Sequence, residues 1–586
     1  MINNLFLCYS SHKIRFSEKC SEPINNHNHE AYMSNKTISG AELVVATLNA
    51  HDVPHIFGIP GAKIDSVFDA VCDNGPEIII CHHEQNAAFM AAATGRLTGK
   101  AGVCLATSGP GASNLVTGVA TANSEGDPVV ALAGAVPLSM YSHNTHQSMD
   151  TRSLFNPISK FSAEVMDSAS VSDVVHKAFR IAEQPTQGAS FVSLPQDVLT
   201  NQIPFIQVQQ PKPILFGGAH PQAIRQAADL INAAKNPVLL LGMDASQPFV
   251  TASIRQLLEQ TKIAVVNTFA AAGVISHDLY DCFLGRVGLF KNQPGDIALN
   301  NADLIITIGY SPIEYDPILW NKDGKTPIIH IGYQQADLEA SYNPVAEVVG
   351  DVAVSVKSIS AELDQREPLE NNQKLQDLRQ DLQHIMRMGI NKTSSMGVHP
   401  LRFVHDLRRF VSDDTTVCCD VGSIYIWMAR YFHSFEPRRL LFSNGQQTLG
   451  VALPWAIAAS LLTPNEKVIS MSGDGGFLFS SMELATAVRH KCNIVHFVWT
   501  DHSYDMVKIQ QLKKYGRESA VSFMGPDIVK YAESFGAHGL AINTADDIEP
   551  VLRKAMALSG PVLVNVNVDY RDNSRLLDQL HPCQQD

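Results

Sequence analysis

The sequence predicts three consecutive α/β units, each built on a doubly wound parallel sheet with helices on both faces. Apolar runs of strand length alternate with longer helical patterns, which is typical of a parallel sheet covered by helices. The chain has 586 residues and 45% hydrophobic content, enough for several domains. A stretch rich in proline and glycine and a stretch rich in charged and amide side chains divide this pattern into three blocks.

The first unit is expected over residues 33–202, followed by a linker at 203–221 that holds four prolines and two glycines. Residues 1–32 are rich in Asn, Ser and His, and they lack an apolar segment long enough for a secretion signal. We interpret them as a disordered extension. The strands expected in the first unit are 78–81, 101–106, 129–133 and 190–194.

The second unit is expected over 222–363 and the third over 395–570, with a helical connector at 364–394 between them and a tail at 571–586. The strands expected in the second unit are 238–241, 263–266, 304–308 and 328–331. Those expected in the third are 416–419, 468–471, 494–499 and 562–566. Ligands of open parallel sheets bind at the carboxyl ends of strands, so functional motifs should follow these runs.

Composition argues against several classes of function. The net charge is -14, and the Lys and Arg residues are scattered, so neither a nucleic acid nor an anionic membrane is an expected partner. The longest apolar run, 451–462, is shorter than the roughly 20 residues that span a bilayer. The ten cysteines form no CxxC pair, which favours a reducing cytoplasm over a disulfide framework or a zinc site.

One motif combines glycines with an aspartate directly after the strand 468–471. Gly473, Gly475 and Gly476 allow the backbone to approach an anion, but Asp474 between them would repel a phosphate unless a metal ion lay in between. Asp501 follows the next strand, and two carboxylates at neighbouring strand ends suit Mg²⁺ with diphosphate oxygens. A GDG triplet alone would favour an ordinary turn, and the second aspartate reverses that preference.

This pair of motifs resembles the metal-binding signature of the thiamine diphosphate enzymes. The resemblance implies that Asp474 and Asp501 are side-chain ligands of Mg²⁺ and that Ser503 contributes its backbone carbonyl. The family often closes the signature with Asn-Asn, where this chain has Thr500-Asp501. Aspartate keeps the oxygen donor, so the site should still bind Mg²⁺.

Thiamine chemistry also requires a carboxylic acid, because the reactive carbon of the cofactor must lose a proton. The strand 78–81 leads through His82 and His83 to Glu84, which begins an alanine-rich helical pattern. An isolated glutamate there could equally be a helix cap. The family resemblance implies that Glu84 pairs with the cofactor of another subunit, so we expect a homodimer or homotetramer. The loop 108–111 is interpreted as lining the thiamine pocket.

Four strings, at 58–65, 146–150, 444–450 and 504–510, resemble the acetolactate synthases, and most closely their FAD-independent catabolic type. The resemblance implies that Leu449 replaces a methionine that wedges between the two cofactor rings, and that Gln447 and Tyr504 lie against the cofactor. It also implies that Gln147 faces the substrate. Lys160 could supply positive charge near a carboxylate, although a solvated surface lysine is the alternative.

The segment 309–316 lacks the arginine that FAD-dependent relatives typically have there, so we expect no FAD. The implied reaction condenses two pyruvate molecules into 2-acetolactate with release of CO₂, in fermentative acetoin or butanediol formation. Pyruvate and 2-oxobutyrate both remain possible acceptors. One alternative is a 2-oxo acid decarboxylase that releases an aldehyde, although such enzymes tend to have a histidine pair where His146-Gln147 stands. A non-catalytic binding subunit is another alternative.

Overall fold

The computed structural model of the chain describes residues 36–365 and 372–580. Within these ranges, three six-stranded sheets follow one another along the sequence, and their strand pairs are all parallel. The predicted class of three α/β units is therefore confirmed. The expected extension at 1–32 lies outside the described residues, as do part of the connector and the end of the tail.

The N-terminal unit has the strand order β3-β2-β4-β5-β7-β6. Its strands are β2 (His55–Gly58), β3 (Glu77–Ile80), β4 (Gly102–Ala106), β5 (Val129–Ala135), β6 (Phe161–Glu164) and β7 (Ala189–Pro195), and a separate antiparallel pair is formed by β1 (Thr37–Ser39) and β8 (Gln202–Pro204). Its helices are α2 (Gly40–Ala50), α3 (Asp65–Asn74), α4 (Glu84–Thr98), α5 (Pro110–Asn114), α6 (Val116–Ser124), α7 (Thr151–Phe155), α8 (Val171–Glu183) and α9 (Gln196–Thr200). The segment 108–111, expected to be a loop, thus runs into the short helix α5.

The central unit has the strand order β11-β10-β9-β12-β13-β14. Its strands are β9 (Pro237–Leu241), β10 (Ala264–Asn267), β11 (Phe283–Arg286), β12 (Leu304–Ile308), β13 (Ile328–Gly332) and β14 (Ala346–Val349). Its helices are α10 (Pro221–Ala233), α11 (Pro248–Thr261), α12 (Pro294–Asn300) and α13 (Val352–Ser360). The helix α14 (Gln373–Arg387) lies in the expected connector.

The C-terminal unit has the strand order β16-β15-β17-β18-β20-β19. Its strands are β15 (Val417–Cys419), β16 (Leu440–Leu441), β17 (Val468–Gly473), β18 (Ile494–Thr500), β19 (His538–Ile542) and β20 (Val562–Asn567). Its helices are α15 (Pro400–Phe410), α16 (Ser423–Tyr431), α17 (Ala452–Leu462), α18 (Asp474–Phe477), α19 (Leu484–Arg489), α20 (Asp505–Tyr515), α21 (Ile528–Ser534), α22 (Ile548–Ala557) and α23 (Asn573–Leu577).

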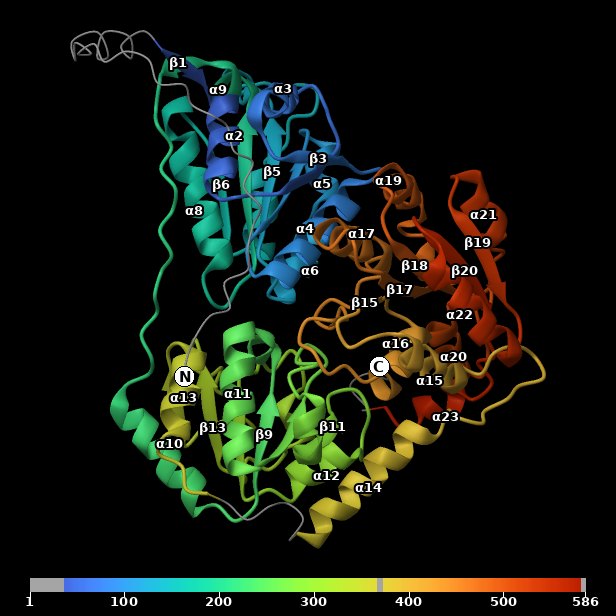
Figure 1. Cartoon of the computed structure of the whole chain (residues 1–586). Coiled ribbons are helices and arrows are strands. Elements are labelled where there is room, and N and C mark those ends of the chain that lie inside the picture. Colours follow the sequence, from blue (N-terminus) through green and yellow to red (C-terminus); the bar gives the residue numbers. More distant parts are fainter. Residues whose placement is uncertain (1–35, 366–371, 581–586) are drawn as a thin grey trace, which may run out of the picture.

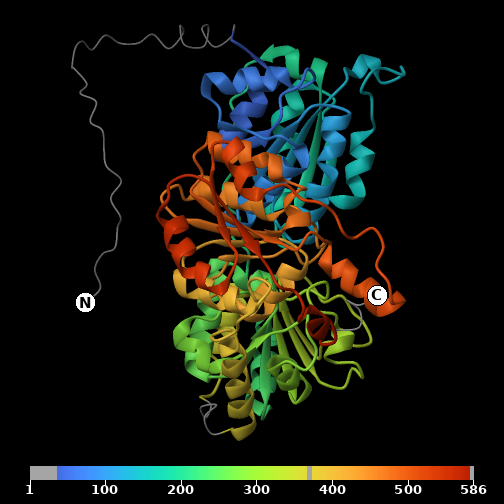
Figure 2. The ribbon, with the colours of Figure 1, turned by 90° about the vertical axis from the view of Figure 1, so that its right-hand side faces the viewer.

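The C-terminal unit packs against both of the other units (Figures 1 and 2). Helix α17 lies beside α4, and buried residues of both helices belong to one hydrophobic cluster that includes Phe89 and Trp455. On the other side, Arg255 of the central unit donates a hydrogen bond to the carbonyl of Phe435 at 2.9 Å. The N-terminal and C-terminal units therefore share a continuous apolar core in one chain.

Helix α4 owes its close packing to small side chains, because seven of its buried positions are alanine, glycine or threonine. It begins after His83, whose ring nitrogen Nδ1 accepts from the amide of Gln85, and it ends at Gly99 in the left-handed conformation. Within the described residues, no helix is long and apolar enough to cross a membrane. The cysteines of the same ranges are free thiols, and all but Cys72 are buried.

Candidate functional site

The candidate site of the C-terminal unit lies where the strand order of its sheet reverses. The chain passes from β15 outward to β16 and then returns to β17 on the other side of β15. A crevice at the carboxyl ends of two such strands is the usual ligand position in open α/β sheets. Asp420 directly follows β15, and Asp474 directly follows β17. The motif predicted from the sequence therefore stands at the switch point.

Asp474 and Asp501 follow two adjacent strands, because Gly473 of β17 pairs with Trp499 of β18. Asp474 accepts hydrogen bonds from the amides of Gly475 at 2.9 Å and His502 at 2.7 Å. The Ser503 hydroxyl donates to the carboxylate of Asp501. Both carboxylates thus approach the same edge of the sheet, with fixed orientations.

The ring of the exposed His502, 4.0 Å from Asp474, is the side chain that pairs with these two carboxylates. Burial, followed by the neighbouring carboxylates of Asp474 and Asp505, raises the pKa of Asp501 to about 7. Burial also raises the pKa of Asp474. The described residues contain no group of three or more His, Cys, Asp and Glu side chains suited to a metal. A cation here would rest on two carboxylates and further oxygens, as Mg²⁺ does beside phosphates.

The glycines of the motif leave room beside the two aspartates. A Cβ atom on Gly473 would meet nothing within 4 Å, whereas one on Gly475 would lie 2.7 Å from the Tyr504 ring and one on Gly476 would lie 3.1 Å from Asp420. A side chain at Gly475 would thus displace the exposed Tyr504 ring, and Gly473 borders open space. An open cradle next to paired carboxylates fits a diphosphate bound through Mg²⁺.

Asp420 connects this motif to the loop 443–449, which carries Gln447 and Leu449. Both oxygens of Asp420 accept from the amide of Gly450 at 3.0 Å, and burial raises the pKa of this carboxyl to about 7. Gln447 is exposed, with a φ of 49°, and Leu449 is half-buried. The predicted cofactor residues of the loop and of the glycine motif therefore lie on either side of Asp420.

The N-terminal unit brings Glu84 and Gln147 to the carboxyl edge of its own sheet. Glu84 is 9% exposed and its carboxylate accepts from Asn114 Nδ2 at 2.9 Å. Ser108 donates to the side-chain oxygen of Gln147 at 3.2 Å, and a Cβ on Gly111 would lie 3.3 Å from Glu84. The segment 108–114 thus contacts both predicted side chains.

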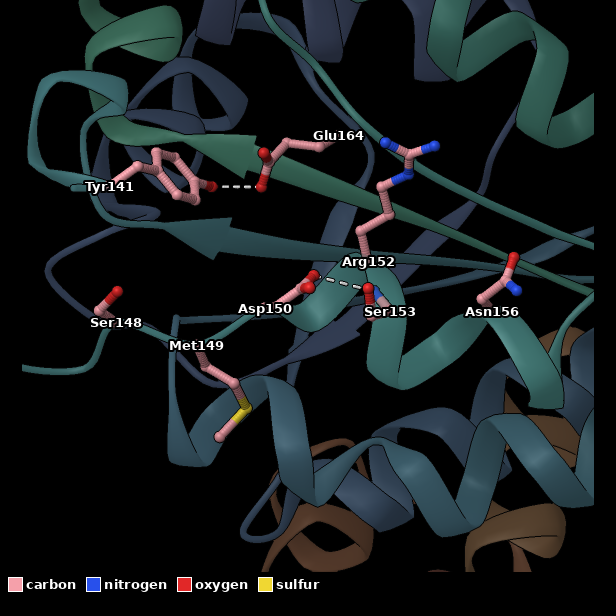
Figure 3. A pocket seen from close by; sticks show the side chains of 8 residues that line it. All are labelled: Tyr141, Ser148, Met149, Asp150, Arg152, Ser153, Asn156 and Glu164. Carbon is pink, nitrogen blue, oxygen red and sulfur yellow. Dashed lines mark hydrogen bonds between the residues drawn. The ribbon is translucent and has the colours of Figure 1, made fainter.

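A cavity of about 720 Å³ is lined by residues from either side of Gln147 in the sequence, among them Tyr141 and Ser148 (Figure 3). Tyr141 donates a hydrogen bond to Glu164, and Asp150 accepts from the amide of Ser153 at 3.0 Å. The guanidinium of Arg152 extends away from Asp150 in this view. Between residues 140 and 154, on either side of Gln147, the exposed large apolar side chains are Met140, Tyr141, Met149 and Leu154.

Lys160 does not join Glu84 and Gln147. It precedes β6, so it stands at the amino end of a parallel strand, whereas the site occupies the carboxyl ends. Its ammonium group donates to the carbonyls of Gln184 at 2.7 Å and Thr186 at 2.5 Å. Burial lowers its pKa to about 8. The lysine is therefore an exposed residue held by two backbone carbonyls, at the edge of the sheet opposite to Glu84.

Three buried carboxylates at the site were missed by sequence reasoning. Asp420 has a recognisable signal, since Asp-Val-Gly follows an expected strand at the edge that carries the other motif. Glu125 accepts from the amide of Gly445 at 2.8 Å, and Glu483 accepts from the amides of His82 and His83. Glu125 and Glu483 each accept from backbone amides of another unit that are at least 320 positions away in the sequence. No local sequence pattern therefore indicates these contacts.

Comparison with known protein families matches all three units. Residues 38–154 match the family described as thiamine pyrophosphate enzyme, N-terminal TPP binding domain. Residues 224–359 match the central domain of the same enzymes, and residues 420–566 match their C-terminal TPP binding domain. The matched segments include Glu84, Gln147, Leu449, Asp474 and Asp501.

Comparison with characterised proteins finds similarity along nearly the whole chain. The chain is 53% identical to acetolactate synthase from Bacillus subtilis (strain 168), over 93% of this chain and 95% of that protein. It is 48% identical to the catabolic acetolactate synthase from Raoultella terrigena, over 93% of this chain and 98% of that protein. It is 29% identical to the large subunit of acetolactate synthase isozyme 1 from Escherichia coli (strain K12), over 92% of this chain and 95% of that protein.

Proposed function

The chain belongs to the acetolactate synthases of the thiamine pyrophosphate enzyme family, and we propose that it condenses two pyruvate molecules into 2-acetolactate and CO₂. The observation that carries this proposal is the 53% identity over 93% of the chain, together with Asp474 and Asp501 at the carboxyl ends of the adjacent strands β17 and β18. The catabolic relative supports a role in fermentative acetoin or butanediol formation. The buried free thiols support work in a reducing cytoplasm.

Thiamine diphosphate would be held through Mg²⁺ by Asp474, Asp501 and the backbone carbonyl of Ser503. Two buried carboxylates next to each other favour a divalent cation, since the carboxylate of Asp474 disfavours the ionised form of Asp501. Gly473, Gly475 and Gly476 would line the diphosphate, with Tyr504 beside them. Mg²⁺ would complete its oxygen shell with diphosphate and water.

When bound, thiamine diphosphate supplies a carbon nucleophile that adds to the carbonyl of pyruvate and stores the electron pair left as CO₂ departs. Glu84 would exchange a proton with the aminopyrimidine ring, and its hydrogen bond to Asn114 fixes the carboxylate for that exchange. Leu449 would hold the two rings in the bent form, and Gln447 would lie against them. Gln147, oriented by Ser108, would face the bound substrate.

We further propose a homodimer or homotetramer in which Glu84 acts on the cofactor of a second copy. The hydrogen-bond partner of Glu84, Asn114, belongs to its own N-terminal unit. Helix α20, which follows the metal motif, has no buried residue within the chain. The large apolar side chains exposed beside the motif are Leu478, Phe479, Tyr504, Val507 and Leu512. An apolar surface beside the metal motif and an exposed apolar segment near Gln147 both suit coverage by a second copy.

Mixed oligomers of two inactive variants test this arrangement. Glu84→Gln and Asp474→Asn are each expected to be inactive, but unfolding and refolding them together should restore part of the activity. A site shared between chains gives the mixed dimer one site without either substitution. Absence of restored activity in a verified mixed dimer would show that each site belongs to one chain.

We propose that the enzyme works without FAD, and the central unit supplies the reason. Its sheet also reverses order between β9 and β12, where a dinucleotide would normally bind. The buried carboxylate of Glu314 accepts there from the amides of Met243 at 3.0 Å and Ser311 at 3.1 Å, and from the Thr268 hydroxyl. The Glu314 carboxylate thus occupies the hydrogen-bond donors that a dinucleotide phosphate would need.

Product analysis tests the proposed reaction. Purified protein supplied with pyruvate, thiamine diphosphate and Mg²⁺ should form 2-acetolactate at the same rate with and without added FAD. Acetaldehyde as the main product would favour the decarboxylase, and no turnover would favour the binding subunit. Competition between pyruvate and 2-oxobutyrate in the same assay determines the acceptor.

A further inference from the structure

Glu483 of the C-terminal unit lies against the turn that presents Glu84. Its side chain is completely buried, and Oε1 accepts from the backbone amides of His82 at 2.9 Å and His83 at 3.1 Å. The same oxygen accepts from the side-chain amide of Asn86 at 3.0 Å. One carboxylate oxygen therefore meets donors on both sides of Glu84 in the sequence.

Thr486 reinforces this contact from the same segment as Glu483. Its hydroxyl lies 2.8 Å from the second oxygen of Glu483 and 2.9 Å from the carbonyl of Ile80, at the end of β3. The strand end, the turn and the first turn of α4 are thus all held by one segment of the C-terminal unit. Such contacts leave Glu84 little freedom to shift along or away from the turn.

We propose that Glu483 is a positioning residue for Glu84, acting through hydrogen bonds and not through its charge. The proposal rests on the proposed function only for the role of Glu84 in proton exchange. If Glu84 serves a second copy, Glu483 couples its position to the C-terminal unit of its own chain. The site of one chain then depends on a carboxylate that never contacts the cofactor there.

The geometry distinguishes three substitutions. Glu483→Gln keeps the side-chain length and an acceptor oxygen, and its amide nitrogen can donate to Thr486 while that hydroxyl donates to Ile80. Glu483→Asp keeps the charge but withdraws the acceptor by one methylene. Glu483→Ala removes the acceptor entirely. Positioning by hydrogen bonds therefore predicts that glutamine retains the function and aspartate loses it.

Backbone hydrogen exchange of the apoprotein gives the first measurement, and it needs no cofactor. The peptide covering residues 80–87 should exchange as slowly in Glu483→Gln as in the parent protein, and at least about tenfold faster in Glu483→Asp and Glu483→Ala. Asp413→Ala serves as the matched control, because Asp413 also accepts across a unit boundary, from His277 at 2.9 Å. It should leave this peptide unchanged.

Loss of deuterium from the reactive carbon of bound thiamine diphosphate gives the second measurement, without pyruvate. A misplacement of about 1 Å can cost about 100-fold in rate, so aspartate and alanine should slow this exchange by about 10- to 100-fold. Glutamine should stay within about threefold of the parent. Adding Glu84→Gln to Glu483→Asp should cause no loss beyond that of Glu84→Gln alone.

Equal backbone exchange of the 80–87 peptide and equal deuterium loss from the cofactor in all the Glu483 variants would overturn the proposal. So would faster backbone exchange and slower loss of deuterium from the cofactor in Glu483→Gln with parent-like rates in Glu483→Asp, since that pattern requires charge. If the alanine variant fails to fold, the comparison of glutamine with aspartate still decides. Neither measurement involves pyruvate, so failure to form acetolactate leaves this test intact.

Discussion

Replacing Arg96 with methionine is expected to weaken the contact between the N-terminal and C-terminal units. The guanidinium donates to both oxygens of Asp127 at 2.7 Å and to the carbonyl of Phe442 at 2.8 Å, and it lies 4.6 Å above the Trp455 ring. Asp127 and Glu125 are 2% and 6% exposed. Methionine would leave both carboxylates buried without this cation, which costs about 3 to 5 kcal/mol.

Thermal unfolding measures this cost. For a unit of 150 to 250 residues, each kcal/mol shifts the midpoint by about 2 to 4 °C, so Arg96→Met should lower the first transition by about 6 to 20 °C. Arg553→Met is the control, because Arg553 pairs with Glu549 at 2.6 Å while both side chains are more than half exposed. That pair is worth about 0.3 to 0.5 kcal/mol. Equal shifts in the two variants would refute the argument that burial determines the cost.

Asp501→Ala removes one of the two side-chain oxygen ligands and should weaken Mg²⁺ binding at least about tenfold, which a titration of the cofactor-dependent thermal shift measures; an unchanged titration would contradict its role. Gly475→Ala places a Cβ 2.7 Å from the Tyr504 ring and should lower cofactor affinity while the apoprotein unfolds at nearly the parent temperature. Burial raises the pKa of Glu314 from 4.5 to about 7, so the folded state binds a proton more tightly and stability falls as pH rises through this window. The free energy of unfolding of Glu314→Gln should therefore exceed that of the parent by about 3 kcal/mol at pH 8, with the difference vanishing near pH 4; denaturant unfolding measures it, and a constant difference would contradict this assignment.

Sequence reasoning located the parts of the site that follow single strands. Asp474 and Asp501 stand after consecutive apolar runs, and the rule that ligands bind at carboxyl ends brings them together without knowledge of the fold. Lys160 shows that residues close in the sequence need not lie at the same edge of a sheet. It lies 13 residues after Gln147, yet a strand start and a strand end are on opposite edges of a parallel sheet.

Contacts between units could not be predicted from local patterns. Glu483 and His82 are 401 residues apart, and Glu125 and Gly445 are 320 residues apart. Each glutamate alone resembles an ordinary polar position near a helix end. Only the packing of α17 against α4 brings these carboxylates to the backbone amides that they accept from.

The stoichiometry of pyruvate consumption tests the central claim most directly. Condensation consumes two pyruvate molecules for each CO₂ released, whereas simple decarboxylation consumes one. With thiamine diphosphate and Mg²⁺ present and FAD absent, we predict a ratio of two, with one 2-acetolactate formed per CO₂. A ratio of one, with an aldehyde as the partner product, would contradict the account.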